Sequence, residues 1–507
     1  MGVKQGCVFS PILFNLFINK ICSTVDQSCD PVQLNNVDVN CLLWADDLLL
    51  ISKTPTGLQN SIDKMHQFYT SLGLDVNIKK TKVMIMNKRG RKLENSQTFK
   101  LNGQKLEITD EYQYLGVKLK PSGSFSLAVQ ELNDKASRAW FGISNIIFKN
   151  KRMQVDRIFG LFDSLVTPVA TYASPLWLPF IIPNKGLENK TSLMDFWENF
   201  KCETINQKCS RMALSVNKKT SRLAVLGELG RYPLFTQSLA QCLNYKLSLF
   251  SRKSSNKLIG HAISEMEQLS KQNSTTWLTR VCQIEKILKI PQNIFLNKSS
   301  GKKLLAIVKS KFDVHFLDKI NEVKFSNLDT NDHNKLRTYK TLKSSFTREP
   351  YIDLIRNRNQ RCFLSRLRAS SHTLRIELGR YTRPITPVDQ RTCQYCCLGP
   401  PTRPPPPGSP TQAPPAPPAA PPDTELHFLV QCTMFTAERN CLFKKIECLN
   451  PSFAALSLND KFKILLCPTS AVCTKLINKF IKNMFKSREK FDEIRSASTL
   501  GCTNPSY

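Results

Sequence analysis

Residues 39–51 read VNCLLWADDLLLI, two short apolar runs separated by the polar break Ala45-Asp46-Asp47. Apolar runs on both sides of such a break predict a pair of strands over residues 38–53, with the carboxylates at their turn. Because apolar sequence flanks Asp46 and Asp47, we expect a half-buried site in which a cation compensates the two charges. Hard divalent cations such as Mg²⁺ take carboxylate oxygens as ligands. An Asp-Asp pair on an ordinary surface turn is the alternative that these residues leave open.

The elements around this hairpin alternate between strand and helix. Apolar residues at three- and four-residue spacing predict a helix over 56–72, which Gly73 ends. Asn102-Gly103 indicates a hairpin because both residues tolerate the positive φ of a type I′ turn. We further predict a helix with Ser10 as its N-cap and Pro11 in its first turn, and strands over 83–86 and 112–119. The first 120 residues therefore have the pattern of an α+β domain.

The composition points to an acidic partner. The chain has 507 residues, with 72 Lys and Arg against 40 Asp and Glu, which gives a formal net charge of +32. Its hydrophobic share of 41% excludes a wholly disordered chain. A nucleic acid is the natural partner, because lysine and arginine release counterions when they neutralise phosphates.

The 18 cysteines are scattered along a long chain and follow no signal peptide, so we expect thiols in a reducing compartment. The most apolar long stretch, residues 159–182, contains Asp163 and three prolines and is not a membrane span. We therefore expect an intracellular protein of the cytoplasm, the nucleus or both, without a membrane partner.

The rest of the chain is predicted to be mostly helical and basic. Residues 400–422 hold 13 of the 29 prolines and predict a linker, either a loop insertion or a ligand for proline-recognising domains. An amphipathic helix is predicted over 472–491, with apolar residues on one face and Lys475, Lys479, Lys482 and Lys486 on another.

Four stretches resemble the reverse transcriptases of non-LTR (LINE-type) retrotransposons, in order and in spacing. Gly2-Val3-Lys4-Gln5-Gly6-Cys7 resembles motif B and Trp44-Ala45-Asp46-Asp47 resembles motif C, where the family normally has Phe or Tyr in place of Trp44. Gly73-Leu74 with Lys80-Thr81 resembles motif D, and Tyr112-Gln113-Tyr114-Leu115-Gly116-Val117 resembles motif E. Residues 161–177 resemble the thumb that follows, and residues 366–381 resemble the stretch before a C-terminal zinc knuckle.

The resemblance implies a role for each matched residue. Asp46, supported by Asp47, would hold two Mg²⁺ ions between the nucleotide phosphates and the primer 3′ hydroxyl. Gln5 and Gly6 would lie against the template and the incoming deoxynucleoside triphosphate, and Tyr114, Leu115 and Gly116 would form the primer grip. Lys80 would lie near the phosphates, although it also reads as an ordinary surface lysine. The implied substrates are an RNA template and a DNA primer.

One departure from the family bears on activity. The family takes a further essential aspartate from motif A, on a strand that precedes motif B, and this sequence begins at motif B. A two-metal site needs carboxylates from both strands. We therefore expect a fragment that is inactive on its own, or else a non-catalytic RNA- or DNA-binding remnant of a decayed element.

A second constellation has the spacing of a zinc site. Cys393 and Cys396 are separated by two residues, and His427 and Cys432 by four, which suits tetrahedral Cys3His zinc and resembles the family's knuckle. Cys397 is an alternative to Cys396. The 30 residues between Cys396 and His427 exceed the family's spacer. The added loop-closure cost is only about 1.2 kcal/mol, against roughly 10–16 kcal/mol for structural zinc.

Together these observations predict an α+β partial reverse-transcriptase palm followed by a mostly α-helical thumb and connector and a small zinc knuckle. The expected division is a partial palm at 1–120, a thumb-like helical region at 121–215, a basic helical connector at 216–390, a knuckle-like region at 391–440 that contains the proline insert, and an amphipathic helical tail at 441–507.

Overall fold

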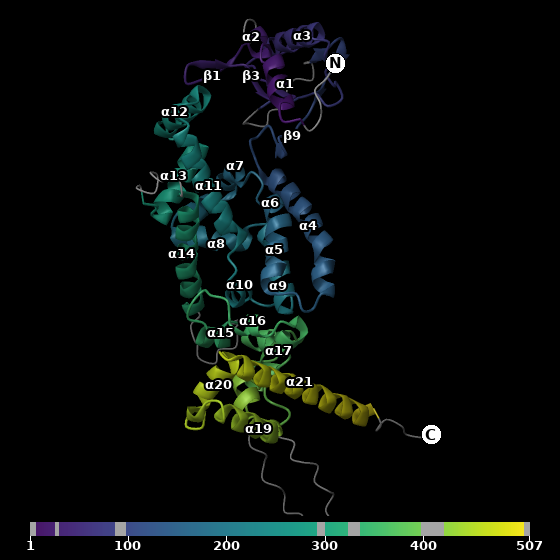
Figure 1. Cartoon of the computed structure of the whole chain (residues 1–507), viewed down its shortest axis with the longest axis vertical. Coiled ribbons are helices and arrows are strands. Elements are labelled where there is room, and N and C mark those ends of the chain that lie inside the picture. The colour runs from purple at the N-terminus through teal and green to yellow at the C-terminus, as the bar shows by residue number, and fades with distance from the viewer. Residues whose placement is uncertain are drawn as a thin grey trace, which may run out of the picture. The chain divides into compact units, whose positions relative to one another are not determined.

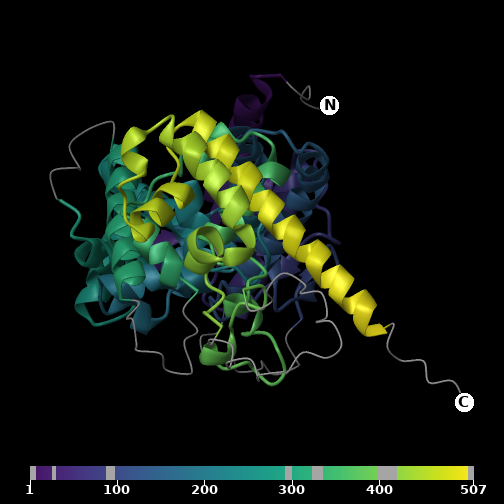
Figure 2. The ribbon, with the colours of Figure 1, turned by 90° about the horizontal axis from the view of Figure 1, so that it is seen from below.

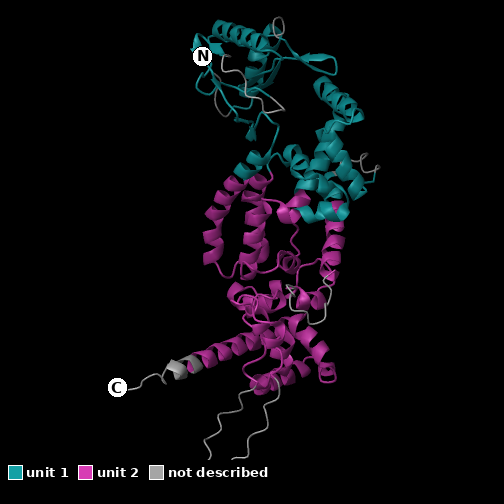
Figure 3. Ribbon diagram, turned by 180° about the vertical axis from the view of Figure 1, so that it is seen from behind, with its two compact units in different colours: residues 1–132, 172–196, 238–305 teal, residues 133–171, 197–237, 306–507 magenta. Residues whose placement is uncertain are grey.

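The computed structural model describes residues 7–25, 30–86, 98–291, 300–322, 335–396 and 420–500. The chain divides into two compact units, each assembled from separated segments (Figure 3). Unit 1 comprises residues 1–132, 172–196 and 238–305, and unit 2 comprises residues 133–171, 197–237 and 306–507.

The N-terminal part of unit 1 combines three helices with five short strand pairs among its described residues. Its helices are α1 (Ser10–Ile18), α2 (Ile21–Val25) and α3 (Pro55–Ser71), labelled in Figure 1. Its strands are β1 (Val32–Leu34), β2 (Val37–Val39), β3 (Cys41–Trp44), β4 (Asp47–Leu50), β5 (Lys82–Val83), β6 (Lys100–Leu101), β7 (Gln104–Lys105), β8 (Glu107–Ile108), β9 (Tyr112–Tyr114) and β10 (Val117–Leu119). Four pairs are antiparallel hairpins and β5 pairs with β8 in parallel.

Most of the predicted elements of this part are confirmed. The hairpin β3–β4 has Trp44 opposite Asp47, and α3 ends before Gly73, whose φ is +68°. The β6–β7 hairpin turns at Asn102-Gly103 with φ of +47° and +74°. The strand predicted over 83–86 is shorter in the structure, because β5 ends at Val83.

Two predictions of this part are wrong in detail. Residues 112–119 are not one strand but the hairpin β9–β10, because the chain reverses at Leu115-Gly116. Ser10 is the first helical residue of α1 rather than its cap.

A small core lies between these elements. Buried side chains of α2, α3, β5 and β6 form it, and Leu43, Leu48 and Leu50 of the β3–β4 hairpin pack against it from one side. The helix α1 contributes Ile18 to this core, whereas Phe9, Ile12, Leu13, Leu16 and Phe17 are exposed. The alternation of β3 and β4 thus anchors the hairpin through its leucines and leaves its tip free of the core.

Beyond residue 120 the described chain is helical, as predicted. Its helices are α4 (Ser126–Lys149), α5 (Val155–Leu165), α6 (Thr167–Ala170), α7 (Ser174–Ile181), α8 (Lys190–Asp195), α9 (Glu203–Leu214), α10 (Arg222–Leu229), α11 (Leu234–Ser251), α12 (Lys257–Lys271), α13 (Trp277–Leu288), α14 (Ser300–Asn321), α15 (Arg337–Leu342), α16 (Tyr351–Leu354), α17 (Arg358–Arg368), α18 (Arg375–Leu378), α19 (Thr436–Glu447), α20 (Leu458–Leu466) and α21 (Ala471–Leu500).

A buried ionic network joins distant segments of unit 2. Arg368, at the end of α17, donates to both carboxylate oxygens of Glu228 and forms an ion pair with Glu349 at 2.8 Å. Arg368 and Glu228 have no exposed surface, and Tyr351 donates a further hydrogen bond to Glu228. Removing either partner would leave a buried charge uncompensated, so the network holds the helices in one arrangement.

The C-terminal helix α21 lies against α17 and α19 (Figure 2). Ile477, Phe480, Ile481 and Met484 are buried, which confirms the predicted apolar face, and Lys475, Lys479 and Lys486 are exposed. Among the described helices, no single one is long and apolar enough to cross a membrane.

Candidate functional site

The paired carboxylates lie at the tip of the β3–β4 hairpin. Ala45 and Asp46 form the turn, and Ala45 has a left-handed φ of +52°. Asp46 and Asp47 are both exposed, so the expectation of a half-buried site is wrong. The flanking leucines bury only the stem of the hairpin, and the two-residue turn carries its polar side chains into solvent. Trp44, opposite Asp47, is 66% exposed.

The β9–β10 hairpin ends in a tight turn at Leu115-Gly116. Both residues have positive φ, +46° and +80°, as a two-residue type I′ turn requires. Tyr172 closes over this turn, because its hydroxyl donates to the Leu115 carbonyl at 2.8 Å. A Cβ at Gly116 would lie 3.0 Å from the Tyr172 ring. Glycine therefore serves here both for its backbone angle and for the close approach of Tyr172.

The two hairpins meet electrostatically at Tyr114. Its partial burial, and then the negative charge of Asp47, raise the pKa of the Tyr114 phenol. Asp47 therefore acts on a residue of the predicted primer grip. The structure brings the stretches that resemble motifs C and E within electrostatic range of each other.

Lys80, Gln5 and Gly6 are the remaining residues predicted to contact the nucleotide or the template. Lys80 is exposed in the turn after Asn77, whose side-chain oxygen accepts a hydrogen bond from the Lys80 backbone at 3.1 Å. This turn fixes the backbone of Lys80 and leaves its ammonium group in solvent. Gln5 and Gly6 lie outside the described residues.

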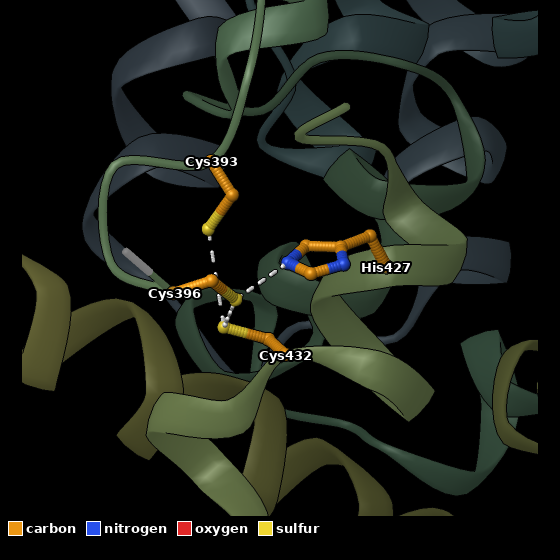
Figure 4. Close-up of side chains that lie close together, drawn as sticks. All are labelled: Cys393, Cys396, His427 and Cys432. Carbon is orange, nitrogen blue, oxygen red and sulfur yellow. Dashed lines mark hydrogen bonds between the residues drawn. The ribbon is translucent and has the colours of Figure 1, made fainter. Parts of the chain in front are cut away.

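In unit 2, the four predicted zinc ligands converge (Figure 4). The Sγ atom of Cys432 lies 4.0 Å from that of Cys393 and 3.6 Å from that of Cys396. The Cys396 Sγ lies 3.2 Å from His427 Nε2, and the ligand atoms of all four residues are within 4.8 Å of one another. A tetrahedral zinc ion with Zn–S bonds of about 2.3 Å places its sulfur ligands about 3.8 Å apart. The donor set and its spacing therefore fit zinc.

The hydrogen bond between the Cys393 and Cys432 thiols shifts their pKa values in opposite directions, and burial acts to raise both. Cys393, His427 and Cys432 are buried, and Cys396 is partly so. The hydrogen bond between the Cys393 and Cys432 thiols raises the pKa of Cys393 to about 12 and lowers the pKa of Cys432. Cys432 is therefore the member of this pair that ionises more readily.

Backbone hydrogen bonds join the two halves of the cluster across the proline insert. Thr392 forms an antiparallel bridge with Pro422, the Cys393 amide donates to the Pro421 carbonyl, and the Asp423 amide donates to the Arg391 carbonyl. Residues 397–419, with Cys397 and most of the predicted linker 400–422, lie outside the described residues. These hydrogen bonds hold residues 391–393 and 421–423 together, next to the four predicted zinc ligands.

Sequence reasoning missed the charged residues around the cluster. Arg488, on α21, is buried, lies 3.7 Å from the Cys393 Sγ through Nη2, and forms an ion pair with Asp423 at 2.9 Å. Its guanidinium also lies over the rings of Tyr395 and Phe428, at 4.4 and 4.6 Å from their centroids. The signal was present in the sequence, since Arg488 follows Met484 by four residues on the apolar face of the helix.

A second buried ionic cluster supports the segment that carries His427. Glu425 accepts a hydrogen bond from Arg337 at 2.6 Å and contacts His372 Nε2 at 2.7 Å. Burial alone would raise the pKa of Glu425, but the charges of Arg337 and His372 hold it well below its ordinary value. His372, in the stretch that resembles the family's pre-knuckle region, thus takes part in holding the backbone before His427.

Comparison with known proteins agrees with the motif pattern. Residues 1–119 match the family model described as reverse transcriptase (RNA-dependent DNA polymerase). The matched residues include the carboxylate hairpin and the β9–β10 hairpin.

The relatives define the group within that class. The chain is 34% identical over 128 residues to the Pol polyprotein of the type-2 retrotransposable element R2DM of Drosophila melanogaster, and 30% identical over 144 residues to that of the type-1 retrotransposable element R2 of Bradysia coprophila. It is 22% identical over 178 residues to the RNA-directed DNA polymerase from mobile element jockey of Drosophila melanogaster. The segment is thus similar to the reverse transcriptases of non-LTR retrotransposons.

These matches cover only part of this chain and only part of each relative. They cover 24%, 27% and 34% of this chain, and 12%, 16% and 19% of the three relatives. The chain therefore aligns with less than a fifth of the length of each of these three proteins.

Proposed function

We propose that residues 1–119 contribute part of the nucleotidyl-transfer site of a polymerase that copies an RNA template from a DNA primer with deoxynucleoside triphosphates. The observation that supports this most is the hairpin tip that exposes Asp46 and Asp47 together. The negative charge of Asp47 also helps burial to raise the pKa of Tyr114 on the β9–β10 hairpin. An exposed carboxylate pair beside a rigid turn is accessible to a bulky nucleic-acid substrate.

Each residue has a role in this proposal. Asp46 and Asp47 would hold Mg²⁺ by their carboxylates, and the bound ions would compensate the phosphate charge of the nucleotide and activate the primer hydroxyl. The Tyr114-Leu115-Gly116 turn, closed by Tyr172, supports the primer end. Lys80 approaches the phosphates, while Gln5 and Gly6 lie against the template and nucleotide.

We further propose that the 507-residue chain does not extend primers by itself. Among the residues that the structure describes, no third carboxylate, histidine or cysteine joins Asp46 and Asp47 in a group that could hold a metal ion. Two adjacent exposed carboxylates bind Mg²⁺ weakly, and a two-ion site needs more oxygen ligands than they offer.

Primer extension on the purified chain tests both statements. With a labelled DNA primer on an RNA template, Mg²⁺ and deoxynucleoside triphosphates, we expect template–primer binding that weakens steeply with salt, and no extension. Template-dependent extension would overturn the inactivity, and its survival in Asp46→Asn would also overturn the carboxylate role. Absence of salt-dependent binding would overturn the substrate assignment.

For unit 2 we propose a structural zinc ion held by Cys393, Cys396, His427 and Cys432. The proposed division of the chain is a partial palm at 1–120, a thumb-like region at 121–215, a helical connector at 216–390, the knuckle at 391–440 and a helical tail at 441–507. The bound ion would stabilise the knuckle, and this chain's own contribution is the preformed donor set, which the Thr392–Pro422 bridge holds in place.

A second candidate function is nucleic-acid binding without catalysis. The net charge of +32 favours it, because this charge does not depend on a complete metal site. Both candidates predict binding without extension, so Asp46→Asn separates them. A Mg²⁺-dependent gain in template–primer binding that Asp46→Asn loses supports the catalytic fragment, and equal binding by the two proteins at every Mg²⁺ concentration supports the non-catalytic alternative.

A further inference from the structure

An exposed aromatic side chain in unit 2 lies outside every motif used above to assign a role in catalysis or metal binding. Tyr381 belongs to the loop that follows α18, which is closed by a hydrogen bond from the Thr386 amide to the Gly379 carbonyl at 3.0 Å. The Tyr381 side chain is 41% exposed, and Ile385 of the same loop is 58% exposed. The loop thus holds two large apolar groups in solvent, which favours a partner that covers them.

Two lysines from distant segments converge on this ring. Lys219 Nζ lies 3.7 Å from the centroid of the Tyr381 ring, and Lys335 Nζ lies 5.3 Å from it. Lys335 also donates a hydrogen bond to the backbone carbonyl of Lys219, which holds the two segments together. We call Lys219, Lys335 and Tyr381 the Tyr381 platform.

The charge of the platform is not balanced by protein groups in the described part of the chain. None of the ion pairs there joins Lys219 or Lys335 to a carboxylate. Cations gathered around an exposed aromatic ring without acidic partners favour an anionic ligand that has flat rings of its own.

We propose that the Tyr381 platform is a binding site for single-stranded nucleic acid. Lys219 and Lys335 pair with neighbouring phosphates, and a base packs against Tyr381 and Ile385. A single strand fits better than a duplex, because its unstacked bases have free faces. The proposal rests on the proposed function to the extent that both involve nucleic acid, but it assigns a site that is separate from the carboxylate hairpin.

Fluorescence anisotropy on the full chain tests this proposal, with a labelled oligouridylate of about 20 nucleotides as the probe. We expect Lys219→Ala/Lys335→Ala to weaken binding about tenfold and to reduce the salt slope by roughly 1.4, since each lost phosphate contact on a single strand contributes about 0.7. Tyr381→Ala should weaken binding at least about fivefold, and Tyr381→Phe should stay within about twofold of the wild type, because it keeps the ring.

The controls separate this site from general charge effects. Lys302→Ala/Lys303→Ala removes the same charge from two exposed lysines of α14 and should change the affinity less than about twofold. Wild-type affinity in both platform variants would overturn the proposal. The same variants are tested with a labelled RNA duplex and with labelled polyglutamate. If Tyr381→Ala weakens duplex binding as much as oligouridylate binding, the single-strand assignment is overturned. If the platform variants weaken polyglutamate binding and leave oligouridylate binding unchanged, the proposal is overturned in favour of an acidic protein partner. Probe binding in the anisotropy assay needs no deoxynucleoside triphosphate and no extension, so failure of the catalytic proposal is distinguishable from failure of this one.

Discussion

The carboxylate hairpin of unit 1 and the Cys/His cluster of unit 2 show two opposite ways to hold metal-binding residues. Asp46 and Asp47 are exposed on a two-residue turn, whereas three of the four residues of the cluster are buried. The cluster is further enclosed by Arg488, Asp423 and the Thr392–Pro422 bridge. Its donor atoms are already at zinc spacing, while the aspartates have no third ligand among the described residues.

This difference implies different dependence on ligands. A preorganised buried donor set gains folding free energy when its ion binds, because the ion does not bind the unfolded chain as well. An exposed carboxylate pair binds its ion weakly and therefore adds little folding free energy. The ion depends on substrate phosphates for its other ligands. Metal should therefore act on the stability of unit 2 and leave that of unit 1 almost unchanged.

The largest expected effect follows from breaking the cluster. In Cys432→Ser we expect zinc content to fall from about one ion per chain to near zero, and backbone amides of α19 and α21 to lose about 100-fold of their protection from hydrogen exchange. Metal analysis and hydrogen exchange with mass spectrometry measure both. The matched control is Cys441→Ser, which changes an exposed thiol of α19 outside the cluster. Normal zinc content in Cys432→Ser would refute the ligand assignment.

Replacement of Arg488, which lies beside the cluster, should have a smaller effect on zinc binding. Three thiolates and one Zn²⁺ carry a net negative charge, which the buried Arg488 is placed to compensate. We expect Arg488→Leu to weaken zinc binding about 10- to 100-fold, as the loss of an outer-shell partner does, and to leave Asp423 buried without its cation. Competition with a chromophoric chelator measures the affinity. Lys486→Leu, an exposed neighbour on the same helix, controls for the charge change, and equal affinities in the two variants would contradict this role.

These two cases also show what sequence can predict. The Cys/His spacing, the Asn102-Gly103 turn and the helix α3 were predicted because each depends on residues close in the chain. The roles of Arg488 and Asp423 were not, because their pairing forms only when α21 packs on the knuckle. The same holds for Arg368, whose partners Glu228 and Glu349 are far away in sequence.

Two of the errors in unit 1 have local causes. Leu115 has a positive φ, which a leucine side chain does not signal, so the β9–β10 turn was read as continuous strand. Apolar flanks suggested burial of Asp46 and Asp47, but in a hairpin they bury the stem and not the tip. Sequence patterns thus located the functional turns more reliably than they predicted how exposed these turns are.

The next prediction concerns the turn that Tyr172 closes. Gly116→Ala should lower the free energy of unfolding by about 1–2 kcal/mol through its left-handed backbone, and by more through the Cβ that meets Tyr172. Gly103→Ala is the matched control, because Gly103 also has a positive φ, +74°, but no atom within 4 Å of the added Cβ. Denaturant unfolding compares them. If both variants lose the same stability, the contact with Tyr172 contributes nothing.

The smallest effect is expected at the carboxylates themselves. Because Asp47 is exposed, Asp47→Asn should change the free energy of unfolding by no more than about 0.5 kcal/mol. It should nevertheless lower the pKa of Tyr114, since the negative charge of Asp47 opposes formation of the phenolate; burial is the larger cause, so the pKa should stay above its ordinary value.

NMR of ¹³C-labelled tyrosine measures this shift, with Tyr114→Phe to assign the signal. The raised pKa keeps Tyr114 protonated in the folded state to a higher pH than in the unfolded chain. Its contribution therefore leaves stability unchanged below the ordinary tyrosine pKa and reduces it as the pH rises above that value. If the pKa of Tyr114 is the same in Asp47→Asn as in the wild type, the charge of Asp47 does not act on Tyr114. That result would remove the electrostatic link between the two hairpins.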